Sequence, residues 1–329
     1  MELQDIAPNI CSGRDKPSHN GKVILYGSTG VIGMTESASY LDELILVARV
    51  GANAGQLQVA NSPCGVTDNA LVINAHEWNA YIYYYLQYYN LNRLVFGSGQ
   101  PLITGGMLKK IKIKSGKNVE RLKITHLLSL LDQRIETQKK VIEDLKRLKY
   151  AISKRVFAEM GQHHPVVKLG QLCSIKTGKL DANAMIDNGE FPFFTCARED
   201  YRTDTYAFEG DSLLISGNGD IGIVKRYNGK FNAYQRTYVL QDFIQEIAYV
   251  QCFVEHHLPK RVLQEKNVGA MPYIVLSTLS EMPIILPPTY IQNAICKTIG
   301  TISEQINVEE KILANFELQK QYNLSMMFI

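Results

Sequence analysis

The chain has 329 residues, of which 46% are hydrophobic and 20% charged, and its formal net charge is +3, which permits nucleic-acid binding without requiring it. This length is enough for two domains, and no stretch approaches the roughly 18 apolar residues of a membrane span, nor does the N-terminus read as a signal peptide. The six cysteines are scattered without a C-x-x-C pair, which predicts reduced thiols in a cytoplasmic protein.

Residues 1–118 are predicted to form a first globular domain that consists mainly of short strands. The clearest strand is the apolar run LDELILVAR (41–49). The tyrosine-rich stretch NAYIYYYLQYYN (79–90) predicts one short helix, whose rings we expect to pack into a small core rather than to stack on bases.

Residues 119–160 predict one long helix with a heptad seam. Apolar residues recur at alternating steps of four and three, which is typical of a helix that packs along its length against another helix. The seam is interrupted by Gln138 and Lys149. Its central apolar residues are Leu131, Ile135, Ile142 and Leu145.

Residues 161–288 predict a second globular domain with the same character. DSLLIS (211–216) predicts a strand, residues 244–258 predict one helix, and Asn228-Gly229 predicts a hairpin turn of type I′. GNGDIG (217–222) fits the G-x-G-x-x-G pattern, but a predicted hairpin follows it instead of a helix. We therefore interpret it as a glycine-rich turn between strands and not as a nucleotide site.

Residues 289–329 predict a second long helix, which repeats the first at one constant difference in residue number that we call the helix shift. This shift carries Gln138 onto Glu309 and Lys149 onto Lys320, so both seams are interrupted at matching positions. The apolar seam residues of the second helix are Ile302, Ile306, Leu313 and Phe316. Upstream, a slightly smaller shift aligns the two globular regions, so the chain contains one repeat used twice.

The repeat predicts an α+β fold with two pseudo-symmetric α/β domains separated by a pair of long antiparallel coiled-coil helices. The predicted segments are 1–118, 119–160, 161–288 and 289–329. The helices could pair within the chain or mediate homodimerisation, and the matched seams favour pairing within the chain. We interpret the matched polar positions as register markers, since a buried polar residue penalises misaligned pairings.

In combination, these patterns resemble the specificity (S) subunit of type I restriction-modification systems. The resemblance rests on ILYGSTGVIG (24–33), ILVARVGANAGQLQVA (45–60), TDNALVI (67–73), FGSGQPLITGGMLKKIKI (96–113) and LLSLLDQRIETQKKVIEDLKRLK (127–149), with looser versions in the second repeat. It covers essentially the whole chain, so we expect a complete subunit and not a half-length one.

The resemblance implies that each globular region is a target recognition domain that reads one half of a split site in double-stranded DNA. The two helices would set the number of unread base pairs between the halves. Two methyltransferase (M) subunits would dock on the chain, and restriction/translocase (R) subunits would join them. The chain itself would perform no chemistry and would need no cofactor.

The residues agree with a subunit that has no catalytic role. We find neither the Asn/Asp-Pro-Pro-aromatic motif of adenine methyltransferases nor a G-x-x-x-x-G-K-[ST] phosphate loop. His163-His164 and His256-His257 have no cysteine or acidic cluster around them, so we interpret them as surface or interdomain residues and expect no metal site.

DNA contacts require two kinds of side chain. Lysine, arginine and exposed backbone N–H groups suit phosphates, whereas Arg, Lys, Asn, Gln or Ser on loops can reach base edges. The candidates in the first domain are Ser28, Thr29, Arg49, Asn53, Gln56, Ser98 and Gln100, with Lys109 and Lys110 for the backbone. Those in the second domain are Arg198, Arg202, Asn218, Lys225, Arg226 and Arg236, with Lys266 for the backbone.

The two domains differ most at these loops, where YGSTG faces FTCARED and ARVGANAGQ faces SGNGDIGIVKR. This difference predicts a bipartite target whose two half-sites are unlike. The alternative is a cytosolic coiled-coil scaffold for protein interactions without DNA specificity, which leaves the paired glycine-rich, basic loops unexplained.

Overall fold

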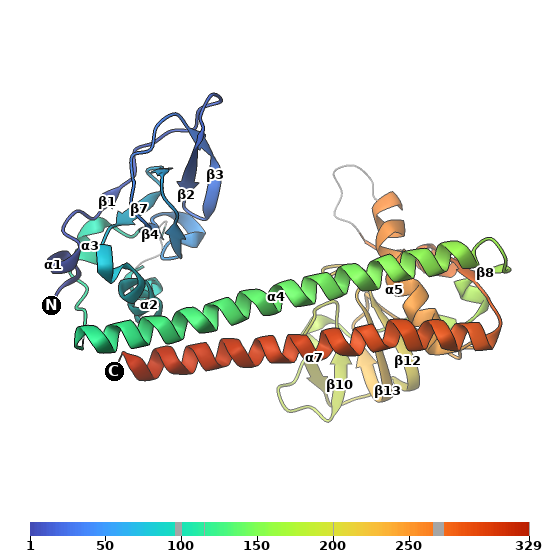
Figure 1. Cartoon of the computed structure of the whole chain (residues 1–329). Coiled ribbons are helices and arrows are strands. Elements are labelled where there is room, and N and C mark those ends of the chain that lie inside the picture. Colours follow the sequence, from blue (N-terminus) through green and yellow to red (C-terminus); the bar gives the residue numbers. More distant parts are fainter. Residues whose placement is uncertain (96–100, 115, 200, 266–272, 329) are drawn as a thin grey trace. The chain divides into compact units, whose positions relative to one another are not determined.

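The computed structural model describes residues 1–95, 101–114, 116–199, 201–265 and 273–328, and the chain divides into two compact units (Figure 1). The first unit comprises Met1–Lys139 and Lys311–Ile329, and the second comprises Lys140–Glu310. Each unit combines a globular region of strands and short helices with part of each long helix. The predicted α+β class is therefore confirmed.

The globular part of the first unit contains two sheets, with the orders β1-β7-β4-β5 and β3-β2-β6. Neighbouring strands are antiparallel except for β2 and β6, which run parallel. The strands are β1 (Cys11–Ser12), β2 (Val23–Gly27), β3 (Gly30–Thr35), β4 (Leu44–Ala48), β5 (Leu57–Ala60), β6 (Cys64–Val66) and β7 (Ala70–Ile73).

Strand β4 lies at the centre of the first unit because its sequence, LILVA, is apolar on both faces. All five of its residues are buried. Since side chains alternate along a strand, Ile45 and Val47 enter one core while Leu44 and Leu46 enter another. The first core also takes in α2 (Asn79–Tyr89), α1 (Leu3–Ile6) and α3 (Gly105–Lys109). It buries Tyr81, Tyr84 and Tyr85 of α2, so the predicted role of these rings in the core is confirmed.

The globular part of the second unit contains one six-stranded sheet, β11-β10-β13-β12-β14-β9, and a small pair, β15-β8. Its main core packs α5 (Ile247–Glu265) and α6 (Leu276–Ser280) against β12 and β14. The strands are β8 (Val166–Lys168), β9 (Ser174–Thr177), β10 (Phe191–Phe194), β11 (Tyr201–Thr203), β12 (Phe208–Ser216), β13 (Val224–Ala233), β14 (Thr237–Gln241) and β15 (Pro283–Ile285).

A hairpin with the same register occurs at matching places in both globular parts. In the first, β2 and β3 pair Val23 with Thr35. In the second, β10 and β11 pair Phe191 with Thr203. Each hairpin also adds a parallel neighbour, β6 or β13. The internal repeat seen in the sequence is therefore also a repeat of strand pairing.

Strand β13 marks the main difference between the two globular parts. It runs unbroken for ten residues, whereas residues 61–63 divide the matching stretch of the first unit into β5 and β6. Pro63 lies in this break and has no backbone N–H to donate to a neighbouring strand. The hairpin turn predicted at Asn228-Gly229 is wrong, because both residues lie inside β13 and pair with Asp211 and Gly210 of β12.

The two predicted long helices are α4 (Asn118–Met160) and α7 (Thr289–Met327). The 43 residues of α4 correspond to about 65 Å at about 1.5 Å per residue. All eight predicted seam residues are removed from solvent to a large degree. Leu131, Ile135, Ile142 and Ile306 are buried, and Leu145, Ile302, Leu313 and Phe316 are half-buried.

The two helices run antiparallel within each unit. In the first unit, Lys320 of α7 lies 2.6 Å from Asp132 of α4, while Arg134 covers the ring of Phe316, one turn earlier in α7. In the second unit, Lys146 of α4 lies 2.6 Å from Glu310 of α7.

The matched lysines Lys320 and Lys149 both anchor a short helix to a long one, with different partners. The Nζ of Lys320 binds Asp132, which also accepts a hydrogen bond of 2.9 Å from the hydroxyl of Tyr84 in α2. The Nζ of Lys149 lies 2.9 Å from Glu255 of α5. The helix shift also carries Tyr84 onto Glu255, so the repeat extends to the short helices. Lys149 thus contacts α5, whereas the sequence suggested a register contact between the long helices.

A matched pair of phenylalanines seals the same two junctions. Phe328 contacts the rings of Tyr81 and Tyr85 at 5.3 and 5.4 Å between centroids. Phe157, which the helix shift carries onto Phe328, contacts Phe253 and His257 at 4.9 and 5.2 Å. Both phenylalanines are 2% exposed, so each is a fixed point where a long helix meets a globular core.

Candidate nucleic-acid interface

The first candidate loop is the two-residue turn between β2 and β3. Ser28 and Thr29 form this turn, and the flanking residues Gly27 and Gly30 pair with each other. Thr29 is exposed and Ser28 is half-buried. Their hydroxyls can donate and accept, which suits either phosphate oxygens or base edges.

The turn between β4 and β5 carries three further candidates. Asn53 and Gln56 are exposed, and the Nε2 of Gln56 donates to the Oδ1 of Asn53 at 3.1 Å. Arg49 is half-buried, and its Nε is a buried donor that has no hydrogen-bond partner among the described residues. Its carbonyl accepts from the backbone N–H of Ile103 at 2.8 Å. The backbone of Arg49 is therefore held in place, while its Nε remains a donor without a partner in the described part of the chain.

One side chain ties these two loops together. The Nε2 of Gln58, in β5, donates to the carbonyl oxygen of Gly27 at 2.6 Å. This bond joins β5, just after Gln56, to the start of the β2–β3 turn. The structure thus brings Ser28 and Thr29 to the same end of the strands as Asn53 and Gln56.

The second unit assembles the equivalent loops in the same manner. The Nζ of Lys225, which matches Gln58 in the repeat, donates to the carbonyl oxygen of Arg198 at 2.8 Å. The exposed guanidinium of Arg198 lies 3.7 Å from Asp220 in the β12–β13 turn. That turn also contains Asn218 and is the glycine-rich turn predicted for residues 217–222.

A third loop, between β13 and β14, meets the other two. The carbonyl oxygen of Arg236 accepts from the backbone N–H of Gly217 at 3.0 Å and from the thiol of Cys196 at 3.4 Å. Asn218 and Arg236 also border a cavity of about 220 Å³. Arg198, Asn218 and Arg236 therefore gather at one end of the sheet, and both arginines are exposed there.

Lys225, Arg202 and Arg226 lie on strands, so their predicted position on loops is wrong, and both arginines donate hydrogen bonds within the protein. Arg202, in β11, donates to the carbonyls of Gly189 and Glu190 at 2.6 and 2.7 Å. Arg226, in β13, binds both carboxylate oxygens of Asp211 at 2.9 and 2.5 Å. This pair lowers the pKa of Asp211 and raises the pKa of Arg226, chiefly through its hydrogen bonds. The strands β11 and β13 therefore include residues that the sequence alone suggested would lie in loops.

The remaining candidates lie elsewhere or outside the described residues. Lys109 ends α3 and Lys110 follows it, next to the core that contains α1 and not at the β2–β3 turn. Ser98, Gln100 and Lys266 lie outside the described residues.

Sequence reasoning missed Gln58, although the repeat itself could have identified it. When the two globular regions are aligned, Gln58 falls on the candidate Lys225, and both side chains donate to a hairpin carbonyl. Gln58 and Lys225 are best described as residues that position the loops, because each side chain donates a hydrogen bond to the protein backbone.

The described residues offer binding groups rather than a metal centre. No group of three or more His, Cys, Asp or Glu side chains suited to a metal ion occurs among them. Nor is any helix in the described part of the chain both long and apolar enough to cross a membrane.

The chain matches the family model for the type I restriction modification DNA specificity domain over residues 9–147 and 164–318. It is 35% identical over 140 residues to the type I restriction enzyme EcoDI specificity subunit of Escherichia coli, a match that covers 43% of this chain and 31% of that protein. It is 29% identical over 159 residues to the type I restriction enzyme MpnII specificity subunit of Mycoplasma pneumoniae, covering 46% and 47%. These matches span about a third to a half of the relatives' own length.

The fold is similar to that of a solved structure, the S subunit of a type I restriction-modification system from M. genitalium. The TM-score is 0.70 at 16% sequence identity, and the alignment covers 100% of this chain and 95% of the other. At this identity the likeness concerns the fold, including the two long helices.

Proposed function

Since the chain belongs to the family of type I restriction modification DNA specificity domains, we propose that it is a non-catalytic specificity subunit that binds a bipartite DNA target. Each globular region would read one half-site. The observation that carries this proposal is that both units gather equivalent loops at one end of their strands but equip them differently. Hydroxyl and amide groups dominate in the first unit, and guanidinium groups in the second.

The loop chemistry fits DNA better than a neutral ligand. Arg198 and Arg236 are exposed cations. Each guanidinium can form two hydrogen bonds with the edge of a guanine base, or it can bind phosphate oxygens. Asn53, Gln56 and Asn218 carry amides that can bind adenine edges. Unlike loops on like scaffolds favour two different half-sites, so the target would be asymmetric.

The long helices would set the spacing between the half-sites. In this proposal the recognition domains are residues 1–118 and 161–288, and the spacer helices are residues 119–160 and 289–329. The seam residues would hold the helices in one register, as knobs-into-holes packing does elsewhere. Two methyltransferase (M) subunits and the restriction/translocase (R) subunits would dock on the chain and supply the chemistry.

A selection experiment tests the proposal directly. The full chain, purified with its methyltransferase partner, would be incubated with a library of randomised DNA duplexes, and bound duplexes would be sequenced. We expect two unlike half-sites at a fixed gap, with affinity that falls steeply as salt rises because phosphate contacts release counterions. A continuous or palindromic motif would contradict the bipartite target. An absence of enrichment would favour the alternative of a coiled-coil protein scaffold.

A further inference from the structure

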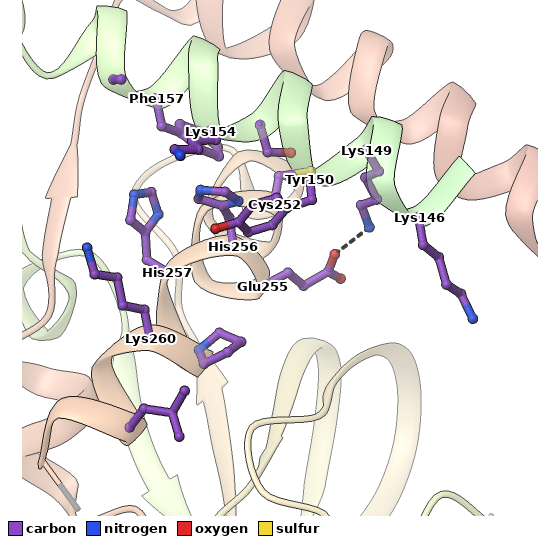
Figure 2. Close-up of a pocket in the computed structure, with 14 residues that line it drawn as sticks. Lys146, Lys149, Tyr150, Lys154, Phe157, Cys252, Glu255, His256, His257 and Lys260 are labelled. Atoms are coloured by element: carbon purple, nitrogen blue, oxygen red, sulfur yellow. Dashed lines mark hydrogen bonds and ion pairs between the residues drawn. The ribbon is translucent and has the colours of Figure 1, made fainter. Parts of the chain in front are cut away.

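The second unit contains a groove between the C-terminal half of α4 and α5, which we call the α4–α5 groove. It has a volume of about 780 Å³. Tyr150 and Lys154 of α4 line one side, and His256, His257 and Lys260 of α5 line the other. In Figure 2, Lys154, the two histidines and Lys260 lie on one side of Glu255, and Lys149 turns to the other side to meet its carboxylate.

The α4–α5 groove carries positive charge that the acidic side chains of the described residues do not neutralise. Of the described residues that line it, Glu255 alone is acidic, and it is already bound to Lys149 at 2.9 Å. Within the described ranges, neither Lys154 nor Lys260 forms an ion pair. Burial, together with the neighbouring His257 and Lys154, lowers the pKa of His256 to about 4, so this ring stays neutral at pH 7. Among the described residues, the groove therefore offers two ammonium groups without an ion pair beside the neutral ring of His256.

Apolar side chains lie among these cations. Phe157 is 2% exposed and contacts both histidine rings, at 5.5 and 5.2 Å between centroids. On the rim, Tyr150 is 60% exposed and Leu263 is 72% exposed. An amphipathic helix lays an apolar face into such a groove and can place carboxylates beside flanking lysines. A DNA backbone offers only sugar and phosphate, which would leave Tyr150 and Leu263 without apolar partners.

Among the described residues, the first unit does not repeat these cations at the matching positions. The helix shift, which relates Phe157 to Phe328, also identifies the positions that match the cations. Lys154, His256 and Lys260 correspond to Ser325, Tyr85 and Tyr89. Helix α2 is also shorter, with 11 residues against 19 in α5. Two identical partners bound to matched surfaces would therefore meet different charges in the two units.

We propose that the α4–α5 groove binds an acidic amphipathic helix of a partner protein, with one copy bound per chain. The carboxylates of that helix would pair with Lys154 and Lys260, and its apolar stripe would contact Tyr150, Leu263 and the histidine rings. This inference concerns a protein contact of the second unit and holds whichever DNA sequence the loops read.

Fluorescence anisotropy with the full chain tests this proposal. The probe is a labelled helical peptide with a leucine stripe flanked by glutamates, and the matched probe replaces each glutamate by glutamine. We expect 1:1 binding of the glutamate peptide. The glutamine peptide, or the variant Lys154→Gln/Lys260→Gln, should bind about ten-fold more weakly, since each exposed pair contributes modestly. Lys154→Arg/Lys260→Arg should restore binding, and Lys297→Gln on the exposed surface of α7 should leave it unchanged.

Three results would overturn the proposal. The first is equal affinity for the glutamate and glutamine peptides, which includes binding of neither. The second is a Lys154→Gln/Lys260→Gln variant that folds, as judged by its circular dichroism, and binds the glutamate peptide as the parent does. The third is displacement of the glutamate peptide by inorganic phosphate or by a short duplex of arbitrary sequence, which would make the groove a phosphate site. DNA selection by the complex is a separate measurement, so either proposal can fail alone.

Discussion

The two units fix a short helix to a long one at matched positions, yet they treat the surrounding surface in opposite ways. In the first unit, tyrosines of α2 and Phe328 fill the junction with rings. In the second, α5 is longer and keeps lysines and histidines along an open groove beside Phe157. The two repeats therefore share the anchoring positions, while the side chains around these positions differ. Surfaces that differ between two copies of one scaffold indicate that the two copies have separate functions.

The largest expected effect is at the paired phenylalanines. Phe157→Ala should lower the free energy of unfolding of the second unit by about 3–5 kcal/mol, because it removes a fully buried ring. Phe328→Ala should cost less, about 2 kcal/mol, because the end of a helix can shift to close the gap. Urea unfolding monitored by circular dichroism measures both, and Tyr150→Ala, on the exposed rim, is the control. Equal costs for the two alanine variants would show that the junctions are equally rigid.

The next effect concerns the matched lysines. Asp132→Ala should destabilise the first unit by about 2–3 kcal/mol, because Lys320 is only 18% exposed and loses its partner charge. Glu255→Ala should cost about 1–2 kcal/mol, since Lys149 is 26% exposed and closer to solvent. The double variant Asp132→Ala/Lys320→Met should recover much of the loss. Additive effects of the two substitutions in a double-mutant cycle would rule out the coupling.

A smaller effect should separate the two units in DNA binding. Arg198→Ala should weaken binding of the selected duplex by about 1–2 kcal/mol and relax the sequence preference in one half-site, as expected for loss of a single base contact. Affinities for duplexes with either half-site scrambled would be compared in the assembled complex. Arg155→Ala, on the surface of α4 and 83% exposed, is the matched control. Equal loss of preference in both half-sites would contradict the division of reading between the units.

The smallest effect is a pH dependence confined to the second unit. The folded protein holds the pKa of His256 at about 4, whereas an unfolded histidine titrates near 6.5. Between these values the unfolded state binds more protons, so stability falls as pH drops from about 6.5 towards 4. After allowance for solvent at this half-buried site, we expect about 1 kcal/mol. The difference between the parent and His256→Gln, measured by urea unfolding at pH 7 and pH 5, isolates this contribution, and a constant difference would refute it. Tyr85, at the matching position, does not titrate in this range.

The long helices and the repeat could be predicted because their signals extend over many residues. A sustained heptad seam and a second copy of it later in the chain leave little freedom for local context. The turn at residues 217–222 was also predictable, since its glycines are followed by strand and not by helix. Local signals failed where neighbours decide the outcome. Asn228-Gly229 is a strong turn sequence, but its pairing with Asp211 and Gly210 of β12 keeps it extended.

The candidate site could be predicted in part, as a set of loops. The sequence indicated Thr29, Asn218 and Arg236 as loop residues, and they lie on loops, while Asn53 ends a single 3-10 turn between β4 and β5. It could not show that Arg226 is held by Asp211, because that pair depends on strand register. The α4–α5 groove was equally hidden, since its two walls lie far apart in the chain. His256 and His257 looked like isolated surface residues until the helices brought Lys154 to them.

The first unit consists of two separate segments of the chain, and this has a consequence for its synthesis. This unit needs residues 311–329, which leave the ribosome only after the whole second unit has been made. The second unit, a continuous segment, can mature while the first still lacks Lys320 and Phe328. Until those residues arrive, Asp132 lacks its cation and the tyrosines of α2 lack their cover. A ribosome that stalls after the second unit, before residues 311–329 are made, would therefore release a chain whose older part is unfinished and is the natural target for proteolysis.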